Sequence, residues 1–277
     1  MSPTWQSEDP PLVVAPRGAG WLLAGLRGGA LALVLALGLA LLSLLRLAEA
    51  PVFGARRPVT PWITVGVCRL ALILLGIRRR GEGRPDPVAG LLVANHVSWT
   101  DIFVLNAVRP VYFVAKSEVA GWPGIGLLAR ATGTVFIARD PRQAQAQAAT
   151  IRARLEAGHR LMLFPEGTST DGRRVLRFRT PLFGALPAGA MRVQPLTLAY
   201  RPPRGADPRF YGWWGDMDMA PHLLQLLAQP RRGEVTVIHH PAIEAHGRDR
   251  KALALACETA VRDGLDVALD PEDVPPR

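Results

Sequence analysis

A run of eighteen uncharged residues, Gly28 to Leu45, constrains this chain more than any other feature. As a helix, at 1.5 Å per residue, it would be roughly 27 Å long, just enough to cross a thin hydrocarbon core. Arg27 and Arg46 flank it. A signal peptide is the competing interpretation, but the run starts far from Met1 and no convincing cleavage site follows it. The run therefore predicts a helix that anchors the chain in a membrane.

A second apolar stretch, Val59 to Ile77, is interrupted by Arg69 and ends in three arginines at 78–80. It is expected to form a second span or an interfacial helix whose arginines meet lipid head groups. We divide the chain into a disordered N-terminus at 1–27, membrane-anchoring helices at 28–80, one folded domain at 81–265 and a flexible tail at 266–277. The N-terminal assignment rests on the wealth of proline and charge before residue 18.

The net charge of +10 is carried almost wholly by arginine, since Lys116 and Lys251 are the only lysines. Such a balance suits a nucleic acid, an anionic membrane surface or an acidic substrate, although genomic base composition explains the choice of arginine equally well. No zinc spacing, aromatic-interleaved basic run or nucleic-acid-binding module is recognisable, so we expect no nucleic-acid partner. The histidines at 239, 240 and 246 lack a carboxylate or cysteine at ligand spacing, so no metal is expected. Cys68 and Cys257 form no disulfide framework, which fits a reducing compartment.

After residue 90, short apolar runs alternate with helical patterns. Strands are expected near 91–95, 111–115, 133–137, 160–164, 193–199 and 234–239, and helices near 99–108, 122–131, 141–157, 217–228 and 249–263. This alternation predicts an α/β fold with a mostly parallel central sheet flanked by helices. Ligands gather at the carboxyl ends of such strands. Polar groups follow three of them: Asn95-His96, Arg139 and Pro165-Glu166-Gly167.

His96 and Asp101 have two interpretations of equal weight on spacing alone. Ser98 to Asp101 directly precedes an apolar helical run, which is the pattern of a capping box, and Asp101 would then only stabilise the helix start. Helical side chains lean toward the N-terminus, so the same carboxylate can also reach back to His96. A carboxylate that accepts from one imidazole nitrogen fixes the tautomer and leaves the other nitrogen as a base.

Asn95-His96-Val97-Ser98-Trp99-Thr100-Asp101 resembles the Asn-His-x-Ser-x-x-Asp block of the glycerolipid acyltransferases, the family of the 1-acyl-glycerol-3-phosphate acyltransferases. Three further blocks of that family follow in order: 133–139 (Gly-Thr-Val-Phe-Ile-Ala-Arg), 164–168 (Phe-Pro-Glu-Gly-Thr) and 193–196 (Val-Gln-Pro-Leu). The resemblance covers roughly residues 60–240. It identifies the domain at 81–265 as an acyltransferase domain.

The resemblance implies that His96, oriented by Asp101, is the general base that takes the proton of the acceptor hydroxyl. That hydroxyl then attacks an acyl thioester without an acyl-enzyme intermediate. General-base help of this kind is worth about 10²–10⁴ in rate. By resemblance, Arg139, Glu166, Gly167 and Thr168 shape the acceptor pocket, and a guanidinium suits a phosphate. Arg139 could also be a solvated strand-end charge and 165–167 a plain tight turn. The Gly167 N–H is also expected to face the developing oxyanion.

The expected reaction is transfer of a fatty acyl group to the sn-2 hydroxyl of 1-acyl-glycerol-3-phosphate, which yields phosphatidic acid. The alternative acceptor is a lyso-ornithine lipid, because residues 213–227 and the loop from Arg173 to Arg179 resemble that subgroup. The donor is expected to be acyl-CoA or acyl-carrier protein, and no cofactor is implied. The expected location is the inner (cytoplasmic) membrane, among membrane lipids, with the catalytic domain facing the cytoplasm.

Overall fold

A computed structural model describes residues 4–9, 13–54, 56–138, 140–185 and 191–269. Its strands are β1 (Ile77–Gly83), β2 (Leu91–Ala94), β3 (Tyr112–Lys116), β4 (Val135–Ile137), β5 (Leu161–Leu163), β6 (Arg192–Arg201), β7 (Gly233–His239) and β8 (Ile243–Glu244). Its α-helices are α1 (Ala19–Phe53), α2 (Thr60–Leu74), α3 (Asp101–Asn106), α4 (Ile125–Thr132), α5 (Ala144–Glu156), α6 (Met219–Ala228) and α7 (Arg250–Leu269). Short 3₁₀ turns occupy Ser117–Gly121, Pro141–Gln143 and Thr180–Ala185.

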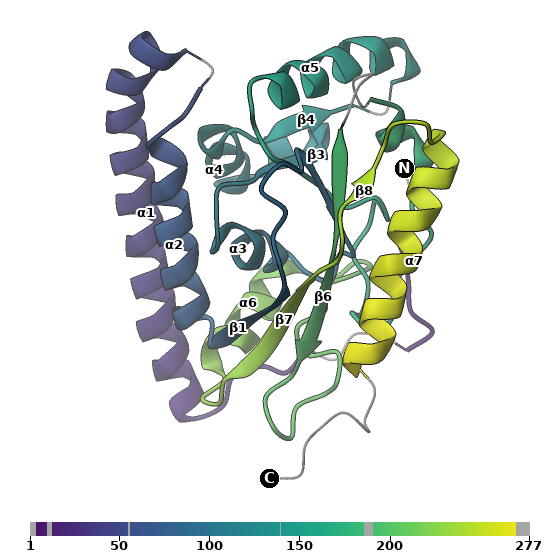
Figure 1. The fold of residues 1–277 in the computed structure, drawn as a ribbon. Coiled ribbons are helices and arrows are strands. Elements are labelled where there is room, and N and C mark those ends of the chain that lie inside the picture. The colour runs from purple at the N-terminus through teal and green to yellow at the C-terminus, as the bar shows by residue number, and fades with distance from the viewer. Residues whose placement is uncertain (1–3, 10–12, 55, 139, 186–190, 270–277) are drawn as a thin grey trace.

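The described strands form one sheet in the order β1-β7-β6-β2-β5-β3-β4, with β8 also paired to β6 (Figure 1). The pairs β1–β7, β6–β2, β2–β5, β5–β3 and β3–β4 are parallel, whereas β6 pairs antiparallel with β7 and β8. The sheet is therefore mostly parallel, and the predicted α/β class is confirmed. Each of the six expected strands is present, with ends within two residues of the expected ones.

The two faces of the sheet have separate cores, and β2 shows why. Its side chains alternate between the faces: Leu92 and Ala94 pack with residues of α1, α2, α3 and α6, while Leu91 and Val93 pack with residues of α5 and α7. All four residues are buried. A strand covered on both faces has no polar positions, which accounts for the continuous apolar run in the sequence.

The first two helices form a hairpin that runs along one side of the α/β domain (Figure 1). α1 begins at Ala19, well before the expected boundary at residue 28, because the apolar pattern continues back through Trp21 and Ala24. Ala24 is buried in the core shared with α6. Among the described helices, α1 is the one long and apolar enough to cross a membrane. An 18-residue stretch of it has a mean hydropathy of 2.4, and only 11% of that stretch is buried.

The arginines at 78–80 do not extend the second apolar helix, and this expectation is wrong. α2 ends at Leu74, and residues 77–83 form β1, the edge strand that pairs with β7. The Arg79 Nε donates to the Val104 carbonyl at 3.2 Å, and Arg80 forms an ion pair with Glu234 at 2.7 Å. The folded α/β domain thus begins at residue 77 rather than 81, and α7 extends it to residue 269.

Candidate active site

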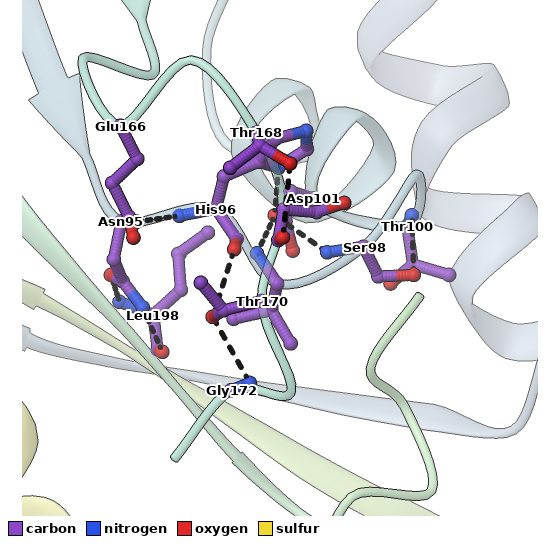
Figure 2. A network of polar contacts seen from close by, with 12 residues as sticks. Asn95, His96, Ser98, Thr100, Asp101, Glu166, Thr168, Thr170, Gly172 and Leu198 are labelled. Carbon is purple, nitrogen blue, oxygen red and sulfur yellow. Dashed lines mark hydrogen bonds and ion pairs between the residues drawn. The ribbon is translucent and has the colours of Figure 1, made fainter. Parts of the chain in front are cut away.

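The sheet brings two of the predicted blocks together, because β2 and β5 are neighbouring parallel strands whose carboxyl ends lie at the same edge. Asn95-His96 leaves the end of β2 and Pro165-Glu166-Gly167 follows β5. Figure 2 shows the network of hydrogen bonds that joins these two segments to α3 and β6. Arg139 follows β4 and lies outside the described residues.

Asn95 fixes the point at which the chain leaves β2. Its buried side chain accepts a hydrogen bond from the Leu198 N–H at 2.8 Å and donates one to the Leu198 carbonyl at 3.0 Å (Figure 2). An asparagine side chain carries an NH₂ donor group beside a carbonyl acceptor, so it can pair with both backbone groups of one residue on β6. This attachment holds the following residue, His96, at the strand end.

The imidazole of His96 lies against the buried carboxylate of Asp101, with Nδ1 2.7 Å from Oδ2 (Figure 2). On its other side the ring stacks on Phe164, with centroids 4.1 Å apart. The His96 side chain is 22% exposed and that of Asp101 is fully buried. An ionised carboxylate accepts from Nδ1–H, which leaves the lone pair on Nε2 and makes the imidazole a base that solvent and substrate can reach.

Three further hydrogen bonds hold the Asp101 carboxylate. The backbone N–H groups of Val97 and Ser98 donate to Oδ2 at 2.8 and 3.1 Å, and the Tyr200 hydroxyl donates to Oδ1 at 2.8 Å. Burial raises the pKa of Tyr200 well above its ordinary value, so its hydroxyl stays a donor. The bond from Ser98 has the spacing of one half of a capping box, although α3 begins at Asp101 with Thr100 as its N-cap residue. One carboxylate therefore binds the backbone just before α3 and also contacts the His96 imidazole.

Glu166 binds the backbone of the same histidine. Its Oε1 accepts the His96 N–H at 2.7 Å and its Oε2 accepts the Leu176 N–H at 2.8 Å. The side chain is 2% exposed. Burial raises the pKa of this carboxyl to about 8, against the opposing effect of the two N–H donors. Glu166 thus ties the loop after β5 to the backbone of His96 and does not line an open acceptor pocket in this structure.

Residues 164–167 form a tight turn, in which the Gly167 N–H donates to the Phe164 carbonyl at 3.0 Å. This N–H is engaged in the turn and does not face the site as an oxyanion donor. Gly167 has a φ of +72°, and a Cβ there would meet the Arg179 side chain at 2.9 Å, so both backbone conformation and space favour glycine. Thr168 accepts the Trp5 N–H at 3.3 Å through Oγ1. The tight turn is thus present, while a role of this block in an acceptor pocket stays a prediction.

Two side chains of the site, Tyr200 and His222, are not predicted from the sequence. Tyr200, on β6, contacts Asp101 across nearly a hundred residues of chain. His222, on α6, accepts the Trp99 indole N–H at Nδ1 (3.0 Å) and faces the Phe210 carbonyl at Nε2 (3.3 Å). Burial lowers the pKa of His222 to about 4, so this ring is neutral and positions Trp99. The sequence feature that could have indicated His222 is its position as a histidine within the apolar run of α6.

Comparison with known proteins agrees with this geometry. A family model described as "Acyltransferase" matches residues 77–199. The chain is 51% identical to a lyso-ornithine lipid O-acyltransferase of Rhodobacter capsulatus, over 95% of this chain and 97% of the relative. The chain belongs to the acyltransferase family. It is also 32% identical to a 1-acyl-sn-glycerol-3-phosphate acyltransferase of Neisseria gonorrhoeae, over 75% of this chain and 83% of that one.

The fold is similar to the crystal structure of a 1-acyl-sn-glycerophosphate acyltransferase from Thermotoga maritima. The TM-score is 0.55 at 19% sequence identity, and the match covers 87% of this acyltransferase and 97% of that chain. At such low identity the match bears on the fold alone. It agrees with an α/β fold that has a mostly parallel sheet and a long apolar helix near the N-terminus.

Proposed function

We propose that this acyltransferase transfers a fatty acyl group from a thioester donor to the hydroxyl of a lyso-ornithine lipid. The observation that carries the proposal is the His96–Asp101 pair: a reachable imidazole held by a buried carboxylate, at the end of a central strand. The relative from Rhodobacter capsulatus, which is 51% identical over nearly its full length, is named as a lyso-ornithine lipid O-acyltransferase. This reverses the order of the two acceptors expected from sequence, since the relative named for 1-acyl-glycerol-3-phosphate is less similar.

The residues support a direct transfer. His96 Nε2 accepts the proton of the acceptor hydroxyl while the oxygen attacks the thioester carbonyl carbon. The tetrahedral intermediate then collapses, the C–S bond breaks, and the thiolate takes the proton from the imidazolium. Asp101 stabilises that imidazolium, because Oδ2 accepts from Nδ1–H throughout. The donor is acyl-CoA or acyl-carrier protein, both of which carry a thioester activated for this step.

The location we propose is the inner (cytoplasmic) membrane, with the α/β domain on the cytoplasmic side. Leucines on the outer side of α1 support membrane attachment, since Leu33, Leu37, Leu41 and Leu44 are 59%, 61%, 48% and 66% exposed. α2 adds the exposed Trp62 and Ile73. Such a broad apolar surface is unfavourable in water and favourable in lipid. Because α1 contacts both α2 and α6, we infer that the hairpin lies along the membrane surface beside the domain.

The test is a transfer assay on purified protein in detergent, with labelled acyl-CoA or acyl-carrier protein and each lysolipid in turn. We expect ornithine lipid as a product identified by mass, and a loss of at least about 10² in kcat for His96→Ala. His246→Ala, an exposed histidine far along the chain, is the matched control and should retain full activity. Consumption of the donor without acylated acceptor would indicate a thioesterase and contradict the proposal, as would near wild-type turnover of His96→Ala.

A further inference from the structure

Beside His96 lies a cluster of charged and indole side chains, Asp171, Arg174, Asp207, Arg209 and Trp214, which we name the Arg209 cluster. Two backbone hydrogen bonds place it. The Thr170 N–H donates to the His96 carbonyl at 2.9 Å, and the Trp213 N–H donates to the Val97 carbonyl at 2.9 Å. Asp171 and Trp214 are the next residues along each segment. The cluster therefore adjoins the backbone of His96, the residue proposed as the base, and of Val97.

The charges of this cluster are balanced. Arg209 donates to Asp207 at 3.2 and 3.3 Å, and Arg174 donates to Asp171 at 3.3 and 3.2 Å. Asp207 raises the pKa of the Arg209 guanidinium, with Asp9 and Asp171 acting in the same direction. A phosphate monoester needs an excess of cations, and here it would meet as many carboxylates as guanidiniums. A ligand with one carboxylate and one ammonium matches such a site at both ends.

A partly open hollow lies at one side of the cluster, and Asp207, Arg209, Trp214, His222 and Gln225 are among the residues that line it. Trp214 is 3% exposed, and its indole N–H has no hydrogen-bond partner among the described residues. A buried donor without a partner is costly, and an oxygen of a bound ligand would relieve that cost. The guanidinium of Arg209 lies 5.8 Å from the centroid of the Trp214 indole. A cation and a neutral donor for one anionic group thus border the same hollow.

The start of the chain closes the cluster on one side. The Arg174 Cζ lies over the Trp5 ring, 4.9 Å from the ring centroid. The centroids of the Trp5 and Trp214 rings are 6.2 Å apart. Gln6 donates to Asp216 at 3.0 Å. These residues precede α1, the apolar helix. His222 and Gln225, which line the hollow, belong to α6, and α6 packs against α1, so the apolar helix lies next to the element that carries part of the site.

We propose that the Arg209 cluster binds the zwitterionic head group of the lysolipid acceptor, with Arg209 and the Trp214 N–H holding its carboxylate and Asp207 holding its ammonium group. This assignment rests on the proposed function, because the lyso-ornithine head carries these two groups and no phosphate. Arg209 and Asp207 are then specificity-determining residues that select the acceptor, while His96 carries out the proton transfer.

The experiment crosses two variants with two chemically altered acceptors. Wild type, Arg209→Gln and Arg204→Gln are assayed with lyso-ornithine lipid and with its carboxyl methyl ester; Arg204 is exposed, in the same loop, and serves as the control. Wild type and Asp207→Asn are assayed with the lipid and its N-acetylated derivative. Each result is the ratio of kcat/KM for the native lipid to that for the altered one. This ratio is independent of the fraction of enzyme that is folded.

For wild type and Arg204→Gln, we expect the native lipid to be preferred over its methyl ester by tenfold or more. For Arg209→Gln the preference should fall close to one, because the partner of the carboxylate is missing, and Asp207→Asn should lose the preference over the acetylated lipid. A full preference retained in both variants would overturn the head-group site while leaving the proposed function intact. Wild-type protein that does not acylate lyso-ornithine lipid at all would overturn both.

Discussion

Asp101 combines two roles that are usually carried by separate residues. Its Oδ2 accepts from two backbone N–H groups at the start of α3 and from the His96 imidazole, and Oδ1 accepts from Tyr200. Both oxygens of the carboxylate therefore face hydrogen-bond donors. A side chain that places an N–H group where either carboxylate oxygen lies would face one of these donors at close range.

Asp101→Asn should lower both stability and turnover, since the amide nitrogen must lie against a donor and the imidazole loses the acceptor that fixes its tautomer. Thermal unfolding and kcat of the folded fraction are measured together. Asp249→Asn is the matched control, because exposed Asp249 accepts the N–H groups of Lys251 and Ala252 at the start of α7, far along the chain from His96. It should change stability only slightly, because an amide oxygen still accepts both N–H groups, and it should leave turnover unchanged. Reduced stability with unchanged turnover in Asp101→Asn would make Asp101 a helix cap only.

Glu166 gives a dependence of stability on pH whose sign follows from its burial. Its pKa is raised from 4.5 in the unfolded chain to about 8 in the fold, so the folded state binds the proton more tightly. The stabilisation from this group is complete below pH 4.5 and declines as the pH rises to about 8. The stability of wild type relative to Glu166→Gln should therefore decrease from pH 5 to pH 8.5. Thermal unfolding of both proteins across this range, with a difference that stayed constant or increased, would contradict the assigned shift.

At the scale of the elements, the sequence was most informative where an element is buried on both sides. β2 and β5 appear as apolar runs because both faces of the sheet are covered, and their positions follow from that pattern alone. β1 could not be predicted in this way. Its arginines resemble the end of a membrane helix, and the residues that make it a strand lie in β7, more than 150 residues later. Tyr200 was missed for the same reason: its contact with Asp101 depends on the order of the strands.

The exposed leucines of α1 provide a test of membrane attachment. Replacing Leu33, Leu37, Leu41 and Leu44 together by Gln should release much of the protein from vesicles, because each buried side chain contributes about 1.5–3 kcal/mol to transfer out of water. The fold should persist, since these side chains point away from the core. Replacing the exposed Leu255 and Val267 of α7 is the control and should change nothing. Unchanged vesicle binding of the α1 variant would show that the hairpin does not hold the protein at the membrane.

At the scale of the whole molecule, the site lies where the ends of two central strands meet segments from distant parts of the sequence. The central strands β2 and β5 deliver His96 and Glu166 to one edge of the sheet. Segments near residues 170 and 213 are hydrogen-bonded to the backbone of His96 and Val97. Residues before α1 contact the loop after β5 through Trp5 and Thr168. The position of the catalytic blocks could be predicted because each follows its strand directly. The surroundings that select the acceptor could not, because they combine residues near 5, 171 and 209 that only the fold brings together.

The acceptor preference of the wild-type protein tests this account most directly. It is measured as kcat/KM for lyso-ornithine lipid and for 1-acyl-glycerol-3-phosphate, with one donor under one detergent condition. A balanced set of carboxylates and guanidiniums beside His96 favours a zwitterionic head over a phosphate. The account predicts a preference of tenfold or more for lyso-ornithine lipid, equivalent to about 1.4 kcal/mol in transition-state binding. Equal use of the two lipids, or a preference for 1-acyl-glycerol-3-phosphate, would contradict it.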